Sequence, residues 1–197
     1  GGNAVADILS GKVNPSGKLA TTIPIRYEDD ATAASFPGVT FKNKPIAGMA
    51  GMPSFEAEVV YDEGIYVGYR YFNSFGVQTA YPFGYGLSYT NFTFSKPVLS
   101  SSSFGNSMAI KITVKNTGQV AGREVVQLYL AAPQKSAHKP NTELKGFGKT
   151  ALLQPGQSET INIALSPMHL ASFIESRTAW IADAGQYMVH LGASSSD

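Results

Sequence analysis

The residues best suited by type and spacing to acid–base chemistry are carboxylates in the first half of the chain. Asp62 and Glu63 are adjacent, and Glu56 and Glu58 lie shortly before them. Two carboxyl groups that face one reaction centre can act as acid and base. Adjacent side chains of an extended segment point to opposite faces, so Asp62 and Glu63 are poor candidates for such a pair. We expect instead that Glu63 forms an ion pair with a nearby arginine, Arg70 being the candidate, and anchors its segment.

Other reactive side chains lack the spacing that their chemistry requires. His138, His169 and His190 are far apart in sequence, whereas metal ligands usually cluster. The chain has no Gly-x-Ser-x-Gly elbow for a serine nucleophile. It has no cysteine, which excludes disulfides, thiolate metal sites and a cysteine nucleophile. The sequence therefore predicts no metal site and no cofactor.

The charge balance and hydrophobicity of the chain limit the kinds of partner that it is expected to bind. The chain has 15 basic and 14 acidic residues and a formal net charge of +1, so it lacks the basic surface that nucleic acids or anionic membranes attract. Its apolar runs are far shorter than the ~18 residues of a membrane span. We expect neither nucleic acid nor a membrane as a partner. The 197 residues suffice for one or two domains with a sizeable core.

Aromatic residues and glycines concentrate in two phrases, Tyr61–Phe72 and Tyr81–Thr90. No single period fits them, so we expect neither a simple helix face nor a simple strand face. Such segments typically dock aromatic rings onto another surface, with glycines where the backbone turns or approaches closely. We therefore expect a structural, interdomain role for these residues, with Gly64 and Gly68 packing closely against a neighbouring domain. The predicted set is Tyr61, Glu63, Gly64, Tyr66, Gly68, Tyr69, Arg70, Tyr71, Phe83, Tyr85 and Tyr89.

Residues 1–26 read as a helix, a turn and a strand. Val5, Ile8 and Leu9 are spaced as on one helix face, and residues 18–23 form a short predicted strand closed by Pro24. One such unit cannot bury itself, so we expect it to complete an α/β domain. The chain opens inside this helical pattern with no leader-like segment, which predicts an internal start. Residues 27–90 show no strong period before the aromatic phrases and predict an extended, wrapping linker.

Residues 91–197 change to an alternating pattern of apolar and polar positions. About seven short strands separated by turn signals predict an antiparallel β-sandwich of the immunoglobulin or fibronectin III type, so the chain as a whole is mainly β. Residues 168–174 could form a helical turn. Trp180 and Tyr187 are the candidates for core aromatics.

Several phrases, in order, resemble the C-terminal part of glycoside hydrolase family 3, the β-glucosidase-like enzymes. Residues 3–19 resemble the end of that family's α/β sandwich domain, and the two aromatic phrases resemble its connection to the last domain. Residues 114–118, 122–130 and 143–147 resemble its fibronectin III-like domain. The likeness covers nearly the whole chain and is least characteristic over residues 28–58.

The resemblance implies retaining hydrolysis of terminal β-D-glucosides or related β-glycosides by a larger enzyme. Such enzymes use two carboxyl groups ~5 Å apart. In the family the nucleophile lies on an N-terminal barrel and the acid/base upstream of the phrase that opens this chain. The resemblance thus places no catalytic residue here and implies an inactive fragment whose partner is the N-terminal catalytic portion, with a β-linked saccharide as substrate. It is consistent with a periplasmic or secreted location, a cytoplasmic one being left open, and with a homodimer.

Three alternatives stay open. The chain could be one half of a nicked enzyme that works beside its N-terminal portion. Tyr66, Tyr69, Tyr71 and Phe72 could form a sugar-stacking platform rather than an interface. The sandwich could also be a carbohydrate- or partner-binding module without enzymatic activity. Exposed aromatics on one sandwich face would favour that module, whereas the predominance of aliphatic residues at the predicted core positions disfavours it. The polar loop 134–140 could approach an active-site rim.

Overall fold

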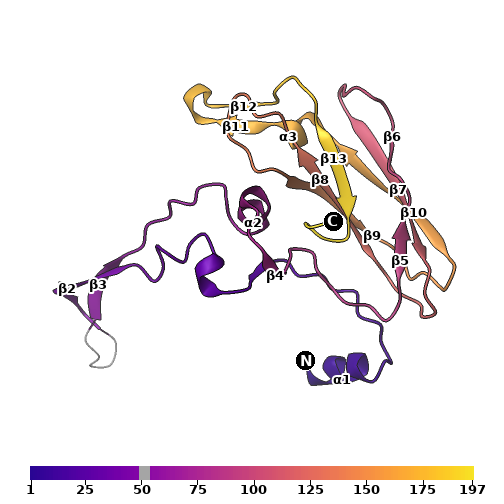
Figure 1. Cartoon of the computed structure of the whole chain (residues 1–197), viewed down its shortest axis with the longest axis horizontal. Coiled ribbons are helices and arrows are strands. Elements are labelled where there is room, and N and C mark those ends of the chain that lie inside the picture. Colours follow the sequence, from indigo (N-terminus) through magenta and orange to yellow (C-terminus); the bar gives the residue numbers. More distant parts are fainter. Residues whose placement is uncertain (49–53) are drawn as a thin grey trace.

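The computed structural model describes residues 1–48 and 54–197. A β-sandwich formed by residues 91–197 carries the chain's compact core, and residues 1–90, here called the arm, extend away from it (Figure 1). No helix among the described residues is long and apolar enough to cross a membrane.

The sandwich consists of two antiparallel sheets with seven strands in the described part of the chain, which confirms the predicted mainly β fold. One sheet has the order β10-β7-β5, with β6 also paired to β7, and the other has the order β13-β8-β9. The strands are β5 (Phe92–Phe94), β6 (Val98–Leu99), β7 (Met108–Asn116), β8 (Val125–Ala131), β9 (Glu143–Lys149), β10 (Ser158–Leu165) and β13 (Met188–Gly192).

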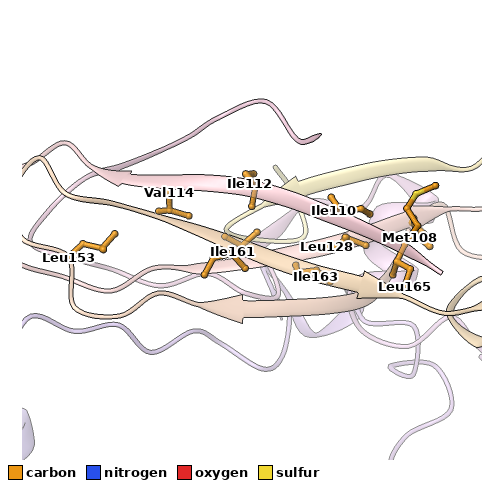
Figure 2. Close-up of a cluster of buried hydrophobic side chains, with 11 residues drawn as sticks. Met108, Ile110, Ile112, Val114, Leu128, Leu153, Ile161, Ile163 and Leu165 are labelled. Atoms are coloured by element: carbon orange, nitrogen blue, oxygen red, sulfur yellow. The ribbon is translucent and has the colours of Figure 1, made fainter. Parts of the chain in front are cut away.

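Alternation along β7 and β10 builds the core. Ile110, Ile112 and Val114 on β7 point inward, and Ile163 and Ile161 on β10 are the partners in register of Ile110 and Ile112 (Figure 2). Residues of one strand that lie two apart share a face, so this apolar pattern makes one face of the β10-β7-β5 sheet hydrophobic. Each such side chain contributes about 1.5–3 kcal/mol on burial.

Strand β8 departs from alternation because both of its faces are covered. Val126, Leu128 and Leu130 enter the core, while Gln127 and Tyr129 on the opposite face are also buried. The second face lies under the arm. The buried polar residues of β8 therefore mark where the arm rests on the sandwich.

A small hairpin, β11–β12, lies outside both sheets, between β10 and β13 in sequence. Trp180 was expected in the core but is 57% exposed, because within the described residues β12 pairs only with β11. Tyr187 is partly buried, and its hydroxyl donates to the Asp183 carbonyl at 2.9 Å. The helical turn predicted over 168–174 ends early and a strand follows. The elements are α3 (Pro167–Leu170), β11 (Ser172–Ile174), the 3-10 turn η2 (Glu175–Arg177) and β12 (Ala179–Ile181).

The arm begins with the predicted helix α1 (Gly2–Leu9), on which Val5 and Leu9 are exposed and Ile8 is partly buried. The strand predicted over 18–23 is reduced to β1 (Ile23–Pro24), because the Leu19 backbone bonds to Gly84 and Tyr85 instead. Residues 27–90 are less irregular than expected. They contain η1 (Tyr27–Asp29), a ribbon of β2 (Val39–Ile46) and β3 (Ser54–Glu58), helix α2 (Tyr69–Phe75) and β4 (Thr79–Tyr81). The end of the small-residue stretch 46–52 lies outside the described residues.

Candidate functional site: an aromatic joint between arm and sandwich

Helix α2 is the part of the arm that contacts the sandwich through aromatic rings. The first aromatic phrase was expected to be neither a simple helix face nor a simple strand face, and its last residues, from Tyr69 on, begin α2. Gly68 precedes it with φ 56° and Gly76 ends it in the left-handed conformation with φ 66°, so two glycines set its limits. Phe72 is 2% exposed and anchors the inner face. The sequence did not show a helical period here because tyrosines occupy both faces of this short helix.

Tyr69 is the centre of the contact between α2, the second aromatic phrase and strands β8 and β9, which is here called the joint. Its ring centroid lies 5.1 Å from that of Phe83 and 5.6 Å from that of Tyr129 on β8. Its hydroxyl oxygen accepts a hydrogen bond from the Leu144 amide of β9 at 2.8 Å. Three separate chain segments thus meet on one side chain. Aromatic pairs at such distances add about 0.5–1.5 kcal/mol each to the burial energy.

Burial fixes the protonation of the neighbouring tyrosine. It raises the pKa of the Tyr129 hydroxyl well above its ordinary value, and Tyr69 and Asp197 add to this electrostatically. The neutral hydroxyl donates to Gln127 Oε1 at 2.5 Å. Gln127 in turn donates from Nε2 to the Ala193 carbonyl at 2.7 Å. A continuous series of hydrogen bonds, from Tyr129 through Gln127 to Ala193, therefore runs along the covered face of β8.

The predicted ion pair between Glu63 and Arg70 is wrong. The Arg70 guanidinium lies 3.3 Å from the Glu143 carboxylate, because α2 packs against β9 and brings Arg70 to that strand. Lys145 also pairs with Glu143 at 3.2 Å. Glu63 Oε2 is enclosed and has no hydrogen-bond partner among the described residues. Arg70 anchors the joint as expected, but to the sandwich rather than within the arm.

The glycines of the joint have two different functions. Gly64 has φ 57°, and a Cβ on Gly64 or Gly68 would meet open space, so backbone conformation rather than close packing within this chain explains both. A Cβ on Gly84 would overlap the side-chain amide of Gln127. A Cβ on Gly86 would overlap the backbone carbonyl of Gly17. Gly84 thus lets the second aromatic phrase approach the sandwich closely, whereas Gly86 lets that phrase approach Gly17 within the arm.

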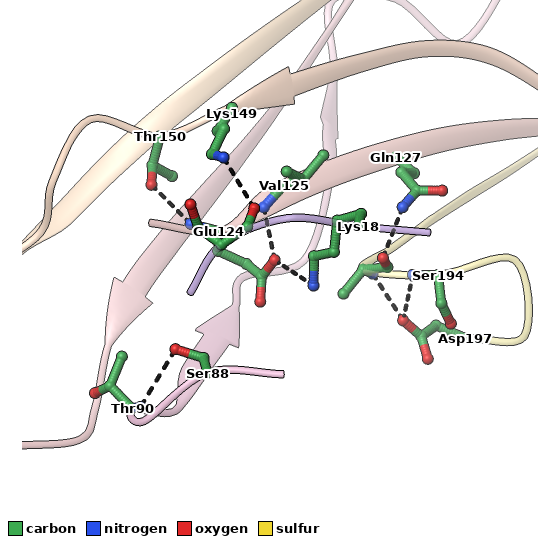
Figure 3. A network of polar contacts seen from close by, with 12 residues as sticks. Lys18, Ser88, Thr90, Glu124, Val125, Gln127, Lys149, Thr150, Ser194 and Asp197 are labelled. Carbon is green, nitrogen blue, oxygen red and sulfur yellow. Dashed lines mark hydrogen bonds and ion pairs between the residues drawn. The ribbon is translucent and has the colours of Figure 1, made fainter. Parts of the chain in front are cut away.

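The C-terminal residues close over the joint. The side-chain amide of Asn73 donates to the Ser195 carbonyl at 2.6 Å, and the backbone amide of Ser195 donates to the Phe83 carbonyl at 2.9 Å. Asp197 accepts from the amides of Ala193 and Ser194 at 2.7 and 2.8 Å (Figure 3). The end of the chain thus connects α2 to the second aromatic phrase.

A second, polar attachment was missed by sequence reasoning. Lys18 Nζ lies 2.7 Å from Glu124 Oε1, with both side chains largely buried (Figure 3). Asn14 donates to the Ala121 carbonyl at 3.0 Å and accepts from the Tyr89 amide at 2.8 Å. The available signal was Glu124 at the start of an apolar strand, which demands a partner.

The remaining predicted residues lie beside the joint. Tyr66 and Tyr71 pack on Phe75 at centroid distances of 5.1 and 5.2 Å, and Tyr81 packs on Tyr85 at 4.9 Å. The Tyr89 hydroxyl donates to the Ile8 carbonyl at 2.8 Å. Tyr61 is 80% exposed.

Of the carboxylates considered for acid–base chemistry, one takes part in an ion pair of the arm. Glu56 forms an ion pair with Lys44 at 2.9 Å across the β2–β3 ribbon. Within residues 1–48 and 54–197, no three His, Asp or Glu side chains could together hold a metal ion.

The arm leaves much apolar surface uncovered. Its exposed large hydrophobic residues run from α1 to the second aromatic phrase, whereas isolated domains usually expose little contiguous apolar area. They include Val5, Leu9, Val13, Ile23, Ile25, Tyr27, Val60, Tyr61, Ile65, Val67, Phe75 and Tyr81. Such an arm is typical of a segment that docks onto further protein.

The family comparisons match both parts of the chain. Residues 1–69 match the glycosyl hydrolase family 3 C-terminal domain, and residues 124–195 match the fibronectin type III-like domain. The fold and the joint define a region in which an extended arm is attached to a fibronectin III-like β-sandwich. The chain corresponds to the C-terminal portion of glycoside hydrolase family 3 proteins.

Relatives share the whole of this region. The beta-glucosidase BoGH3A of Bacteroides ovatus is 38% identical over 203 residues, which cover 100% of this chain and 25% of that protein. An exo-alpha-(1->6)-L-arabinopyranosidase of Bifidobacterium longum is 37% identical over 100% of this chain and 24% of its own length. The solved beta-glucosidase 3B of Thermotoga neapolitana has a TM-score of 0.84 and 44% identity over 98% of this chain and 25% of that one. The chain therefore spans about a quarter of the relatives it matches.

Proposed function

We propose that this chain is the structural C-terminal part of a β-glucosidase-like glycoside hydrolase. The observation that carries the proposal is the contrast between the closed sandwich core and the uncovered apolar side chains of the arm. The sandwich holds the arm through the joint, and the arm docks onto the N-terminal catalytic portion. In this arrangement the chain stabilises the geometry on which the spacing of two distant carboxyl groups depends. The limits of the three regions, at residues 26 and 90, stay predictions.

Catalysis and sugar choice would then belong to the N-terminal portion. Two relatives named for different activities, a beta-glucosidase and an arabinopyranosidase, are 38% and 37% identical to the chain over its full length. A segment equally similar to both is a poor candidate for selecting the sugar. The proposed substrate class is a terminal β-D-glucoside or a related β-glycoside, cleaved by the whole enzyme with retention.

Activity measurements test this assignment. The pure 197-residue chain is expected to show no turnover of 4-nitrophenyl β-glucoside, while the longer enzyme that contains it does. Turnover by the pure chain above a mock preparation would overturn the proposal.

Docking is tested separately by adding the chain to the N-terminal portion made as a separate polypeptide. We expect co-elution in size-exclusion chromatography and recovery of activity. Tyr61→Asp places a charge on the exposed arm and should weaken both, whereas Val98→Asp on the exposed edge of the sandwich serves as the matched control. Equal behaviour of the two variants would argue against docking through the arm.

Two finer expectations accompany this function. A homodimer is tested by the mass of the longer enzyme in light scattering. A periplasmic or secreted location is tested by cell fractionation with an antibody to this chain.

A further inference from the structure

A groove of about 760 Å³ lies away from the joint's centre, between the β11–β12 hairpin, the loop 136–140 and the beginning of α2. This volume is within the ~300–1,000 Å³ of small-molecule sites. Charged, imidazole and aromatic side chains give the groove its chemistry, and the other lining residues are mostly small or aliphatic. The former are Arg70, His138, Lys139, Glu143, Lys145, Phe173, Glu175 and Trp180.

One wall of the groove is aromatic. Phe173 and Trp180 are direct partners in the β11–β12 register, with ring centroids 5.7 Å apart at 63°. They are 47% and 57% exposed, although burying such rings is among the largest apolar gains available to a fold. The hairpin that presents them joins neither sandwich sheet in the described part of the chain. Neither ring contributes to the core.

Another part of the groove carries buried donors without acceptors. The Lys139 side chain is only 2% exposed, and its Nζ has no hydrogen-bond partner among the described residues. Lys139 forms an ion pair with Asp183 at 3.6 Å, but Asp183 accepts its hydrogen bonds from the side chain and the amide of Ser136. Arg70 binds Glu143 through Nη2, while its buried Nε has no partner in the described structure. Unpaired buried donors cost free energy that an acceptor would recover.

We propose that this groove is an accessory saccharide-binding site. A sugar ring offers an apolar C–H face for the exposed rings of Phe173 and Trp180, and hydroxyl oxygens as acceptors for Lys139 and Arg70. A purely apolar ligand would leave the donors unpaired, and a small anion would leave the rings uncovered. Exposed aromatic residues on a face of the sandwich were expected if the chain were a binding module. The exposed rings of Phe173 and Trp180 lie instead on the hairpin beside the sandwich.

The chain contains its own reporter for this site, because Trp180 is its single tryptophan. Cellotriose is the probe, a choice that rests on the proposed function. Titration of the full chain should give a saturable change in tryptophan fluorescence with a Kd of about 1 mM, a weak but specific interaction. Phe173→Ala keeps the reporter and should weaken binding about tenfold, as expected for one lost aromatic contact.

Two further variants control this titration. Phe147→Ala removes a ring that is 72% exposed outside the groove and should bind as the wild type does. Trp180→Ala, measured by calorimetry, should lose binding. Coincident thermal unfolding of the variants and the wild type shows that the hairpin substitutions leave the sandwich intact. Absence of a saturable response up to about 20 mM, or equal responses from wild type and Phe173→Ala, would overturn the site.

Alternative occupants give different results. A response to acetate or sulfate without one to cellotriose would overturn the saccharide in favour of an anion. In the longer enzyme, a thio-linked cellotriose that resists hydrolysis should bind at two sites, and at one in Trp180→Ala. A single site in both would mean that the N-terminal portion covers the groove, and would overturn the proposal. The 4-nitrophenyl β-glucoside assay stays independent of all these outcomes.

Discussion

The arm and the sandwich differ in where they keep their apolar side chains. The sandwich buries a continuous cluster contributed by both of its sheets and by Leu153. Among the described residues of the arm, Phe72 is the only large hydrophobic side chain that is buried. Side chains of the same chemical kind thus form a core in one region and a surface in the other. The sandwich has what a self-sufficient domain needs, and the arm does not.

Contacts with the sandwich replace a core in the arm. Tyr69, Arg70 and Lys18 each reach a residue on or next to the β8–β9 pair. The arm should therefore depend on the sandwich for its order, while the sandwich should fold without the arm. Substitutions on the two sides of the joint test this asymmetry.

The largest effect is expected in the core. Leu128→Ala removes a side chain with no exposed surface and should lower the free energy of unfolding by about 2–5 kcal/mol, as large-to-small core substitutions do. The arm should lose its order in the same transition. Ile65→Ala in the arm, where the side chain is 48% exposed, is the control and should change stability by less than about 0.5 kcal/mol. Urea unfolding followed by circular dichroism measures both, and similar midpoints would contradict the asymmetry.

The next effect concerns the polar attachment. Lys18→Met leaves Glu124 largely buried without its counter-charge and should cost about 2 kcal/mol. Glu124→Gln with Lys18→Met removes both charges and should recover part of that loss, because the amide oxygen can still accept from Val125. Limited proteolysis should cut the arm of the single variant first. A double variant no more stable than Lys18→Met would show that burial of the charge is not the cause.

Much of the sandwich was predictable from the sequence, because alternation and burial coincide on β7 and β10, where one face is solvated. β8 was harder, since its second face is covered by residues distant in sequence. Trp180 was misplaced because a strand signal does not say which sheet the strand joins. Arg70 was recognised as an anchor, but its true partner Glu143 lies on β9, and no local pattern shows such a contact.

A smaller effect on stability is expected when a single atom of the contact between the arm and the sandwich is removed. Tyr69→Phe keeps the ring contacts with Phe83 and Tyr129 but removes the oxygen that accepts from the Leu144 amide. An amide left without its acceptor costs about 1 kcal/mol. Hydrogen exchange at Leu144 should become faster, while exchange in β7 should stay unchanged. Faster exchange throughout the sandwich would mean that the joint supports the core as well as the arm.

The smallest effect is confined to the loop beside the groove and depends on pH. Hydrogen bonds from the Ser136 side chain and amide, and then the charge of Lys139, hold the pKa of Asp183 below its ordinary value, against the opposing effect of burial. A carboxyl group with a lowered pKa in the folded state stabilises that state above its unfolded pKa of about 4, and the stabilisation is lost as the pH falls through the folded value. The loop 136–140 should therefore become mobile in acid, below about pH 4.

Because Asp183→Asn cannot titrate, the variant should show a loop mobility that is the same at pH 3 and pH 6. Amide signals of Ser136 in nuclear magnetic resonance spectra follow this change directly. If the wild type and Asp183→Asn respond identically to acid, another carboxyl group controls the loop. If neither responds, the hairpin and its loop are held by packing alone, and the region beside the groove resembles the sandwich core more than the arm.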